Sequence, residues 1–169
     1  EQSLSEIYES LEFYSLLKNF EKKEVVKDDI EFEEIEDLSK LELGEEVSLF
    51  VEINDENYHK GDVLGIGLCD KEHNYFLKPE FFGELPQLLG NKIIYTYHGK
   101  ALDVLFMRNK LEGLSINYDL LIAAYLLKGF TKDDIAFLMH PEGIQVEFFT
   151  DAKKNNFSDV EKLKKDAVL

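Results

Sequence analysis

The chain has 169 residues, of which 44% are hydrophobic, so it suits one compact domain and is not a disordered protein. Its net charge of −16 argues against a domain that holds DNA by itself, because such affinity comes largely from Lys and Arg side chains that neutralise phosphates. No apolar run approaches the ~18 residues that cross a bilayer, and the single cysteine, Cys69, fits a reducing, cytoplasmic compartment without disulfides.

The first 20 residues carry the pattern of an amphipathic helix. Apolar side chains recur at spacings of three and four between residues 4 and 20, which places them on one helix face. Ser3 and Glu6 have the spacing of a capping box at its start. The apolar stripe consists of Leu4, Ile7, Tyr8, Leu11, Tyr14 and Leu17.

Residues 24–46 form a strongly acidic segment in which Lys27 and Lys40 are the only basic residues. We interpret this segment as a solvated linker that carries one short strand near Ile30 and Phe32. The alternative is an interaction tail for a basic partner.

Three strands are predicted next. Alternation of apolar and polar residues indicates a half-buried strand over 47–54. A polar turn over 55–61 leads to a nearly continuous apolar strand over 63–69, as expected at the centre of a sheet. Residues 73–77 predict a third strand that forms a hairpin with the second. The apolar face of the first strand consists of Val47, Leu49, Val51 and Ile53.

In the second half, strands alternate with helices. A short helix is predicted over 80–89, a strand over 93–97 and a helix over 100–111. A helix over 119–127 is apolar almost all round, which predicts that it is buried. The inward side chains of the helix over 100–111 are Leu102, Leu105 and Phe106.

Three elements complete the predicted fold. A helix begins at Thr131, with Asp133 and Asp134 in its first turn, and a short strand covers 145–149. The last helix begins at Ser158, where Glu161 completes a second capping box. The order of these elements predicts an α/β fold with a mixed sheet flanked by helices.

Motifs that would identify a catalytic site directly are missing from the sequence. Gly65-Ile66-Gly67 lacks the third glycine of a dinucleotide loop and lies inside a strand, so close backbone packing explains it better. The four histidines have no metal-binding spacing, and no nucleophile elbow of a hydrolase is present. The apolar surroundings of Cys69 predict a buried, inert thiol.

Four segments resemble the 3′–5′ exonuclease-like domain of bacterial family A DNA polymerases, of the DNA polymerase I type of low-GC Gram-positive bacteria. The most specific is 117–127, which resembles the aromatic-Asp-helix segment of that family. Residues 56–68 resemble the start of the domain, and residues 99–103 fall where the family has the helix with its third catalytic carboxylate. Residues 9–18 are similar to the helix that leads in from the 5′-nuclease part.

This resemblance implies a domain organisation and partners. Residues 1–45 would be a lead-in helix and acidic linker from a preceding 5′-nuclease region, and residues 46–169 the exonuclease-like domain with an RNase H-like fold. The partners would be the polymerase and 5′-nuclease domains of the same chain, in a monomer that meets DNA only through the parent enzyme. That polymerase would use Mg²⁺, whereas no cofactor and no membrane are expected for this domain. A first residue other than Met and a last helix that stops in mid-pattern also suggest an excised piece of a longer chain.

Active members of this family cleave a phosphodiester with two divalent metals roughly 3.5–4 Å apart, which carboxylates hold. Two of these carboxylates come from an Asp-x-Glu on the first strand. Counted back from Gly65, the Asp position falls on Phe50 and the Glu position on Glu52. A shift by one residue gives Val51 and Ile53, which bind no metal either.

Asp103 matches the third carboxylate, and the fourth falls around Asp166 or beyond the last residue, so it stays unassigned. The resemblance therefore implies a degenerate site at Phe50, Glu52 and Asp103, with no catalytic residue and no bound metal. Each remaining acid also has a structural interpretation: Glu52 as a solvated strand residue, Asp103 as a surface residue, and Asp119 as the cap of the helix that it begins.

We derive three hypotheses from the sequence. The first is a non-catalytic structural domain that occupies the position of the proofreading exonuclease in a replication and repair polymerase. The second is a residual metal-dependent 3′–5′ exonuclease that uses Glu52 and Asp103. The third is an acidic protein-interaction module whose 24–46 segment binds a basic partner.

Overall fold

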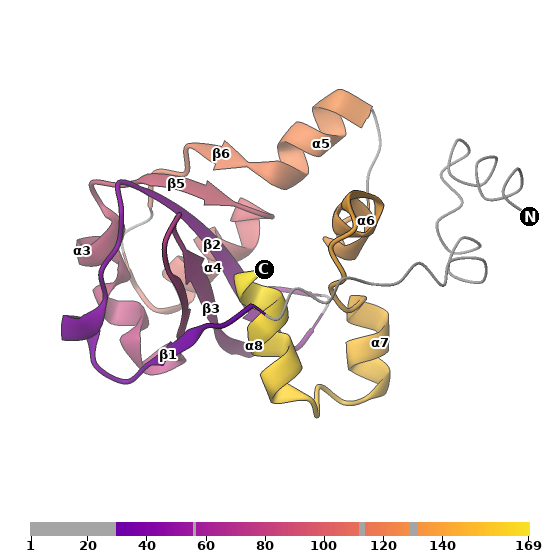
Figure 1. Cartoon of the computed structure of the whole chain (residues 1–169), viewed down its shortest axis with the longest axis horizontal. Helices are drawn as coiled ribbons and strands as arrows, with labels where there is room; N and C mark the ends of the chain where they lie inside the picture. The colour runs from indigo at the N-terminus through magenta and orange to yellow at the C-terminus, as the bar shows by residue number, and fades with distance from the viewer. Residues whose placement is uncertain (1–29, 56, 112–113, 129–131) are drawn as a thin grey trace, which may run out of the picture.

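The computed structural model describes residues 30–55, 57–111, 114–128 and 132–169 (Figure 1). The predicted helix over residues 4–20 lies outside the described residues, as does the predicted helix start at Thr131.

A six-stranded mixed sheet forms the centre of the domain, with strand order β1-β4-β3-β2-β5-β6. β3 pairs antiparallel with both β2 and β4, whereas β1 pairs with β4, β5 with β2 and β6 with β5 in parallel. This confirms the predicted mixed sheet and the hairpin of β3 and β4. The strands are β1 (Glu33–Ile35), β2 (Glu46–Ile53), β3 (Val63–Cys69), β4 (Asn74–Leu77), β5 (Ile93–Thr96) and β6 (Tyr118–Asp119).

Helices cover both faces of this sheet. Short 3-10 turns, η1 (Leu38–Lys40), η2 (Pro79–Glu84) and η3 (His140–Glu142), join or extend the longer elements. The α-helices are α3 (Leu85–Leu89), α4 (Gly99–Arg108), α5 (Leu120–Lys128), α6 (Ala136–Met139), α7 (Phe149–Lys154) and α8 (Val160–Val168).

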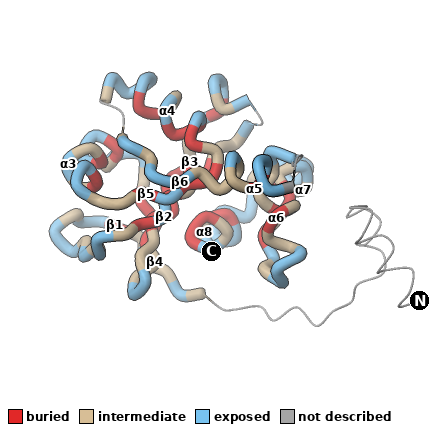
Figure 2. The backbone as a smooth tube through the Cα atoms, turned by 90° about the horizontal axis from the view of Figure 1, so that it is seen from above, coloured by how far each residue is buried: buried red, intermediate tan, exposed pale blue. Residues whose placement is uncertain are grey.

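The larger core lies between one face of the sheet and helices α3 and α4. The alternation in β2 is confirmed, since Val47, Leu49 and Val51 are all buried in this core. Figure 2 shows that buried residues lie along the central strands and in α4. The inward residues predicted for α4 also lie in this core: Leu102, Leu105 and Phe106.

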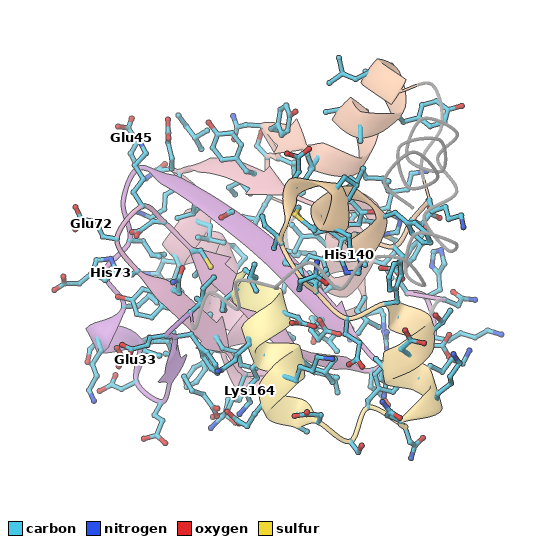
Figure 3. The ribbon with its side chains drawn as sticks, turned by 45° about the vertical axis from the view of Figure 1, so that its right-hand side comes forward. Glu33, Glu45, Glu72, His73, His140 and Lys164 are labelled. Carbon is cyan, nitrogen blue, oxygen red and sulfur yellow. The ribbon has the colours of Figure 1, made fainter. Side chains whose placement is uncertain are left out.

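On the opposite face, α8 packs directly onto the sheet. The carbonyl oxygen of Ala167 would lie 1.8 Å from a Cβ added to Gly67, so β3 and α8 approach to backbone contact there. This confirms the packing interpretation of Gly65-Ile66-Gly67. Lys164, labelled in Figure 3, also ties α8 to β1 by an ion pair with Glu34.

Several predicted elements differ from the structure. The strand predicted near Ile30 and Phe32 is β1, which begins at Glu33, just after Phe32. α4 ends at Arg108 rather than at the predicted Leu111. β1 lies ahead of the predicted domain boundary at residue 46 and pairs with β4, and that boundary stays a prediction.

The segment between α5 and α8 contains three further corrections. Residues 145–148 form no strand, and Phe149 begins α7 instead, because Val146 and Phe148 pack against α6 rather than at a sheet edge. α6 begins at Ala136, with Asp134 accepting a hydrogen bond from its backbone N–H. The N-cap of α8 is Asp159, whose side chain accepts from the backbone N–H of Lys162, so Ser158 and Glu161 form no capping box.

The predicted burial of α5 is wrong. Ala124 is buried, but Ile122, Tyr125, Leu126 and Leu127 are exposed. The inner side of α5 packs on Tyr97 and Leu138, and no described element covers its outer side.

Asp119 caps α5 as predicted, and it also fixes the start of α4. Its carboxylate accepts hydrogen bonds from the backbone N–H groups of Leu121 (3.0 Å), His98 (3.1 Å) and Gly99 (2.7 Å). His98 has a φ of 59°, in the left-handed region that costs energy for a residue with a Cβ. The Asp119 carboxylate therefore holds β5, α4 and α5 together.

We expect Asp119→Ala to lower the free energy of unfolding by about 2–4 kcal/mol, because three backbone donors lose a charged acceptor. Asp119→Asn, which keeps one acceptor oxygen, should lose less. Asp103→Ala, on the exposed side of α4, is the matched control and should stay within about 0.5 kcal/mol of the parent. Urea unfolding of the three variants measures the difference, and equal midpoints for Asp119→Ala and Asp103→Ala would contradict the assignment.

Candidate functional site

Two of the three positions that the family resemblance singles out, Phe50 and Glu52, lie on the face of β2 that meets α8. Phe50 pairs with Gly67 and Glu52 with Gly65 across the antiparallel β2–β3 ladder. α8 occupies the space above Gly67 and the Phe76 ring occupies the space above Gly65, on the face that carries Phe50 and Glu52.

Phe50 joins two apolar clusters on this face. Its ring packs against the cluster of Phe76, Ala167 and Val168, which comes from β4 and α8. It also packs against the cluster of Tyr97, Ala124 and Leu138, and its ring centroid lies 6.3 Å from that of Tyr97. The Phe50 ring is therefore a packing element between α8 and the α5–α6 region.

Glu52 is a buried acid. Burial raises the pKa of Glu52 to about 8, and the negative charges of Asp166, Asp134 and Glu147 act in the same direction. At neutral pH its carboxyl group therefore keeps its proton for most of the time. The interpretation of Glu52 as a solvated strand residue is wrong, because the α6–α8 region covers this end of β2.

The three acids near Glu52 each make a hydrogen bond or ion pair that fixes the local fold. Asp166 accepts a hydrogen bond from the backbone N–H of Glu147 at 2.8 Å, and burial raises the pKa of Asp166. The Asp134 carboxylate accepts from the backbone N–H groups of Ala136 and Phe149, at 3.1 and 2.9 Å. Glu147 pairs with Lys162 of α8 at 3.0 Å. These contacts join α6, α7 and α8 around Glu52.

Asp103 lies apart from this group, on the exposed side of α4. Within the part of the chain that the structure describes, no three His, Cys, Asp or Glu side chains are grouped so that they could hold a metal ion. The structure thus brings Glu52 close to Asp166, the position left unassigned from the sequence, without completing a ligand set with Asp103.

Sequence reasoning missed two members of the acidic group. Asp134 was assigned only to the first turn of a helix, and Glu147 was assigned to a predicted strand. Neither has a motif spacing to Glu52, because their approach depends on how the segment between α5 and α8 folds back over β2. Asp166 was named from the family spacing alone, and the α8–Gly67 contact explains why it faces Glu52.

Cys69 belongs to the same face but has no catalytic partner. Its thiol donates a hydrogen bond to the Val168 carbonyl at 3.1 Å and is half-buried. Burial raises the pKa of Cys69 to about 11, so the thiol stays protonated at neutral pH.

Comparisons with known proteins agree with this fold. The family model described as "DNA polymerase I, ribonuclease H-like domain" matches residues 49–153. DNA polymerase I of Bacillus caldotenax is 31% identical over 90 residues, which cover 50% of this chain and 10% of that protein. DNA polymerase I of Geobacillus stearothermophilus matches with the same identity and coverage. The match to these relatives spans about a tenth of their length, and none of the described helices is long and apolar enough to cross a membrane.

Proposed function

Since the chain belongs to the ribonuclease H-like domain family of DNA polymerase I, we propose that it serves as a non-catalytic structural domain of such a polymerase, in the position of the proofreading exonuclease. The parent enzyme would replicate and repair DNA, and this domain would add shape and packing surface but no hydrolysis.

The observation that carries this proposal is the position of Phe50. In the two-metal mechanism, carboxylate oxygens must surround both cations. The residues present do not fit such a centre, because Phe50 offers an apolar ring where active members of the family have the Asp of the Asp-x-Glu pair, and that ring is held in two apolar clusters. Glu52 beside it has a pKa of about 8, so without a cation it keeps its proton for most of the time at pH 7.

The charge of the domain supports the same role. At −16 the chain repels a DNA backbone, so contact with DNA would come from more basic parts of the parent enzyme. The polymerase and 5′-nuclease domains of the same chain are the partners that this role requires.

We expect the purified protein to degrade a single-stranded oligonucleotide no faster with Mg²⁺ or Mn²⁺ than with EDTA. The matched controls are Glu52→Gln and Asp103→Asn, which remove the two acids that a residual exonuclease would use. Gel analysis of end-labelled DNA should give the same rate for all three proteins. A metal-dependent rate that both substitutions abolish would reject the structural role and establish a residual exonuclease.

A further inference from the structure

The outer side of α5 is an exposed apolar surface. Leu126 and Leu127 are 77% and 85% exposed, and Ile122 and Tyr125 are each 56% exposed. No charged residue lies between Leu120 and Leu127. In Figure 1, α5 leaves the sheet at β6 and lies at the margin of the domain.

This surface continues onto the edge of the sheet. Tyr118 of β6 and Tyr95 of β5 are both exposed, and their ring centroids lie 6.0 Å apart. Exposed apolar side chains grouped on one helix and the strand that leads into it favour an interaction site. We call it the α5 patch, defined as Tyr95, Tyr118, Ile122, Tyr125, Leu126 and Leu127.

The chain itself contains a segment that matches the α5 patch. Residues 4–20, which lie outside the described residues, place six large apolar side chains at helical spacing, and such a stripe needs a partner surface. The acidic residues of that segment, Glu6, Glu9 and Glu12, fall between the stripe positions. They would meet no like charge on the uncharged run from Leu120 to Leu127.

The described chain begins on the face of the sheet that α8 covers. Ile30 packs against the cluster of Phe76, Ala167 and Val168. That cluster shares Phe50 with the cluster that contains the inner side of α5. Residues 21–29, between the predicted helix and Ile30, can span up to about 30 Å when extended, so the predicted helix need not lie beside Ile30.

We propose that residues 4–20 dock as an amphipathic helix on the α5 patch of the same chain. Covalent attachment through a short linker gives the segment an effective concentration in the millimolar range, far above that of a second copy in dilute solution. Docking would bury both apolar surfaces and make the N-terminal segment part of the domain.

A tryptophan on the patch tests this proposal, because the chain contains no other. Leu126→Trp replaces a side chain outside the core. We expect its fluorescence to be quenched by acrylamide about threefold less than in the same protein with Ile7→Glu and Leu11→Glu, since these two charges remove the apolar stripe. Ser5→Glu and Ser10→Glu add the same charge outside the stripe and should leave the protection unchanged.

The remaining outcomes separate the possible occupants. Protection that disappears on dilution identifies a second copy and overturns the proposal. Protection that survives Ile7→Glu and Leu11→Glu at every concentration assigns the cover to another segment, and strong quenching in all variants shows an open patch. Leu127→Trp, measured in parallel, and thermal unfolding of each variant confirm that the result reflects docking.

Discussion

Replacing Gly67 by alanine is expected to lower the free energy of unfolding by about 3 kcal/mol, at the upper end of overpacking effects. The added Cβ would lie 1.8 Å from the carbonyl oxygen and 2.4 Å from the carbonyl carbon of Ala167. These are backbone atoms, so no side-chain rotation relieves the overlap and α8 must move as a unit. Gly65→Ala should also destabilise the fold, because the added Cβ would lie 2.1 Å from the buried Phe76 ring and 2.8 Å from the backbone carbonyl oxygen of Leu77.

Gly83→Ala is the matched control, since a Cβ at Gly83 would have no neighbour within 4 Å. It should leave stability unchanged or raise it by a few tenths of a kcal/mol through the unfolded chain. Urea unfolding compares the stability of the two variants. The rate of Cys69 alkylation reports on the position of α8 directly, because the thiol donates a hydrogen bond to the Val168 carbonyl oxygen. Equal unfolding midpoints for Gly67→Ala and Gly83→Ala would show that α8 does not pack on β3 as described.

This contact explains the shape of the candidate site. The Gly67 position lets α8 lie against the sheet, and α8 then carries Ala167 and Val168 to the Phe50 ring. The same helix brings Asp166 towards Glu52. α8 therefore supplies part of the packing around Phe50 and one of the acidic neighbours of Glu52, and a change that shifts α8 alters both.

The central strands were predictable because their pattern is local. Alternation in β2 and the continuous apolar run in β3 reflect which faces of a sheet are covered, and the structure confirms both. The interpretation of Gly65 and Gly67 as sites of close backbone packing is likewise confirmed. The face that Phe50 and Glu52 share followed from the period of two in a strand.

Burial in the second half was less predictable because it depends on tertiary partners. An apolar helix such as α5 is buried only where other elements pack on it. α6 packs on the inner side of α5 and leaves the outer side exposed. The alternation at Val146 and Phe148 resembled a strand, but their partners lie on α6. The surroundings of Glu52 were missed for the same reason, since Asp134 and Glu147 approach it only through this packing.

The pH dependence of stability should report the buried carboxyl of Glu52. Its pKa is about 8 in the folded chain, against 4.5 for an ordinary glutamate. Between these values the unfolded chain ionises Glu52 while the folded chain keeps the proton, so rising pH favours unfolding. Below about pH 4 the buried Glu52 does not lower the free energy of unfolding. Above about pH 8 it lowers this free energy by its full amount, at most about 5 kcal/mol, since one pKa unit corresponds to about 1.4 kcal/mol.

Glu52→Gln removes this titration while keeping the shape of the side chain. We expect the variant to match the parent at pH 4–5 and to exceed its free energy of unfolding by a few kcal/mol at pH 9, measured by urea unfolding across the range. Glu45→Gln, at an exposed position labelled in Figure 3, changes the net charge equally and should show no such rise. A difference for Glu52→Gln that stays constant with pH would mean that Glu52 is ionised in the folded domain. That result would contradict the burial of Glu52 beneath the α6–α8 region.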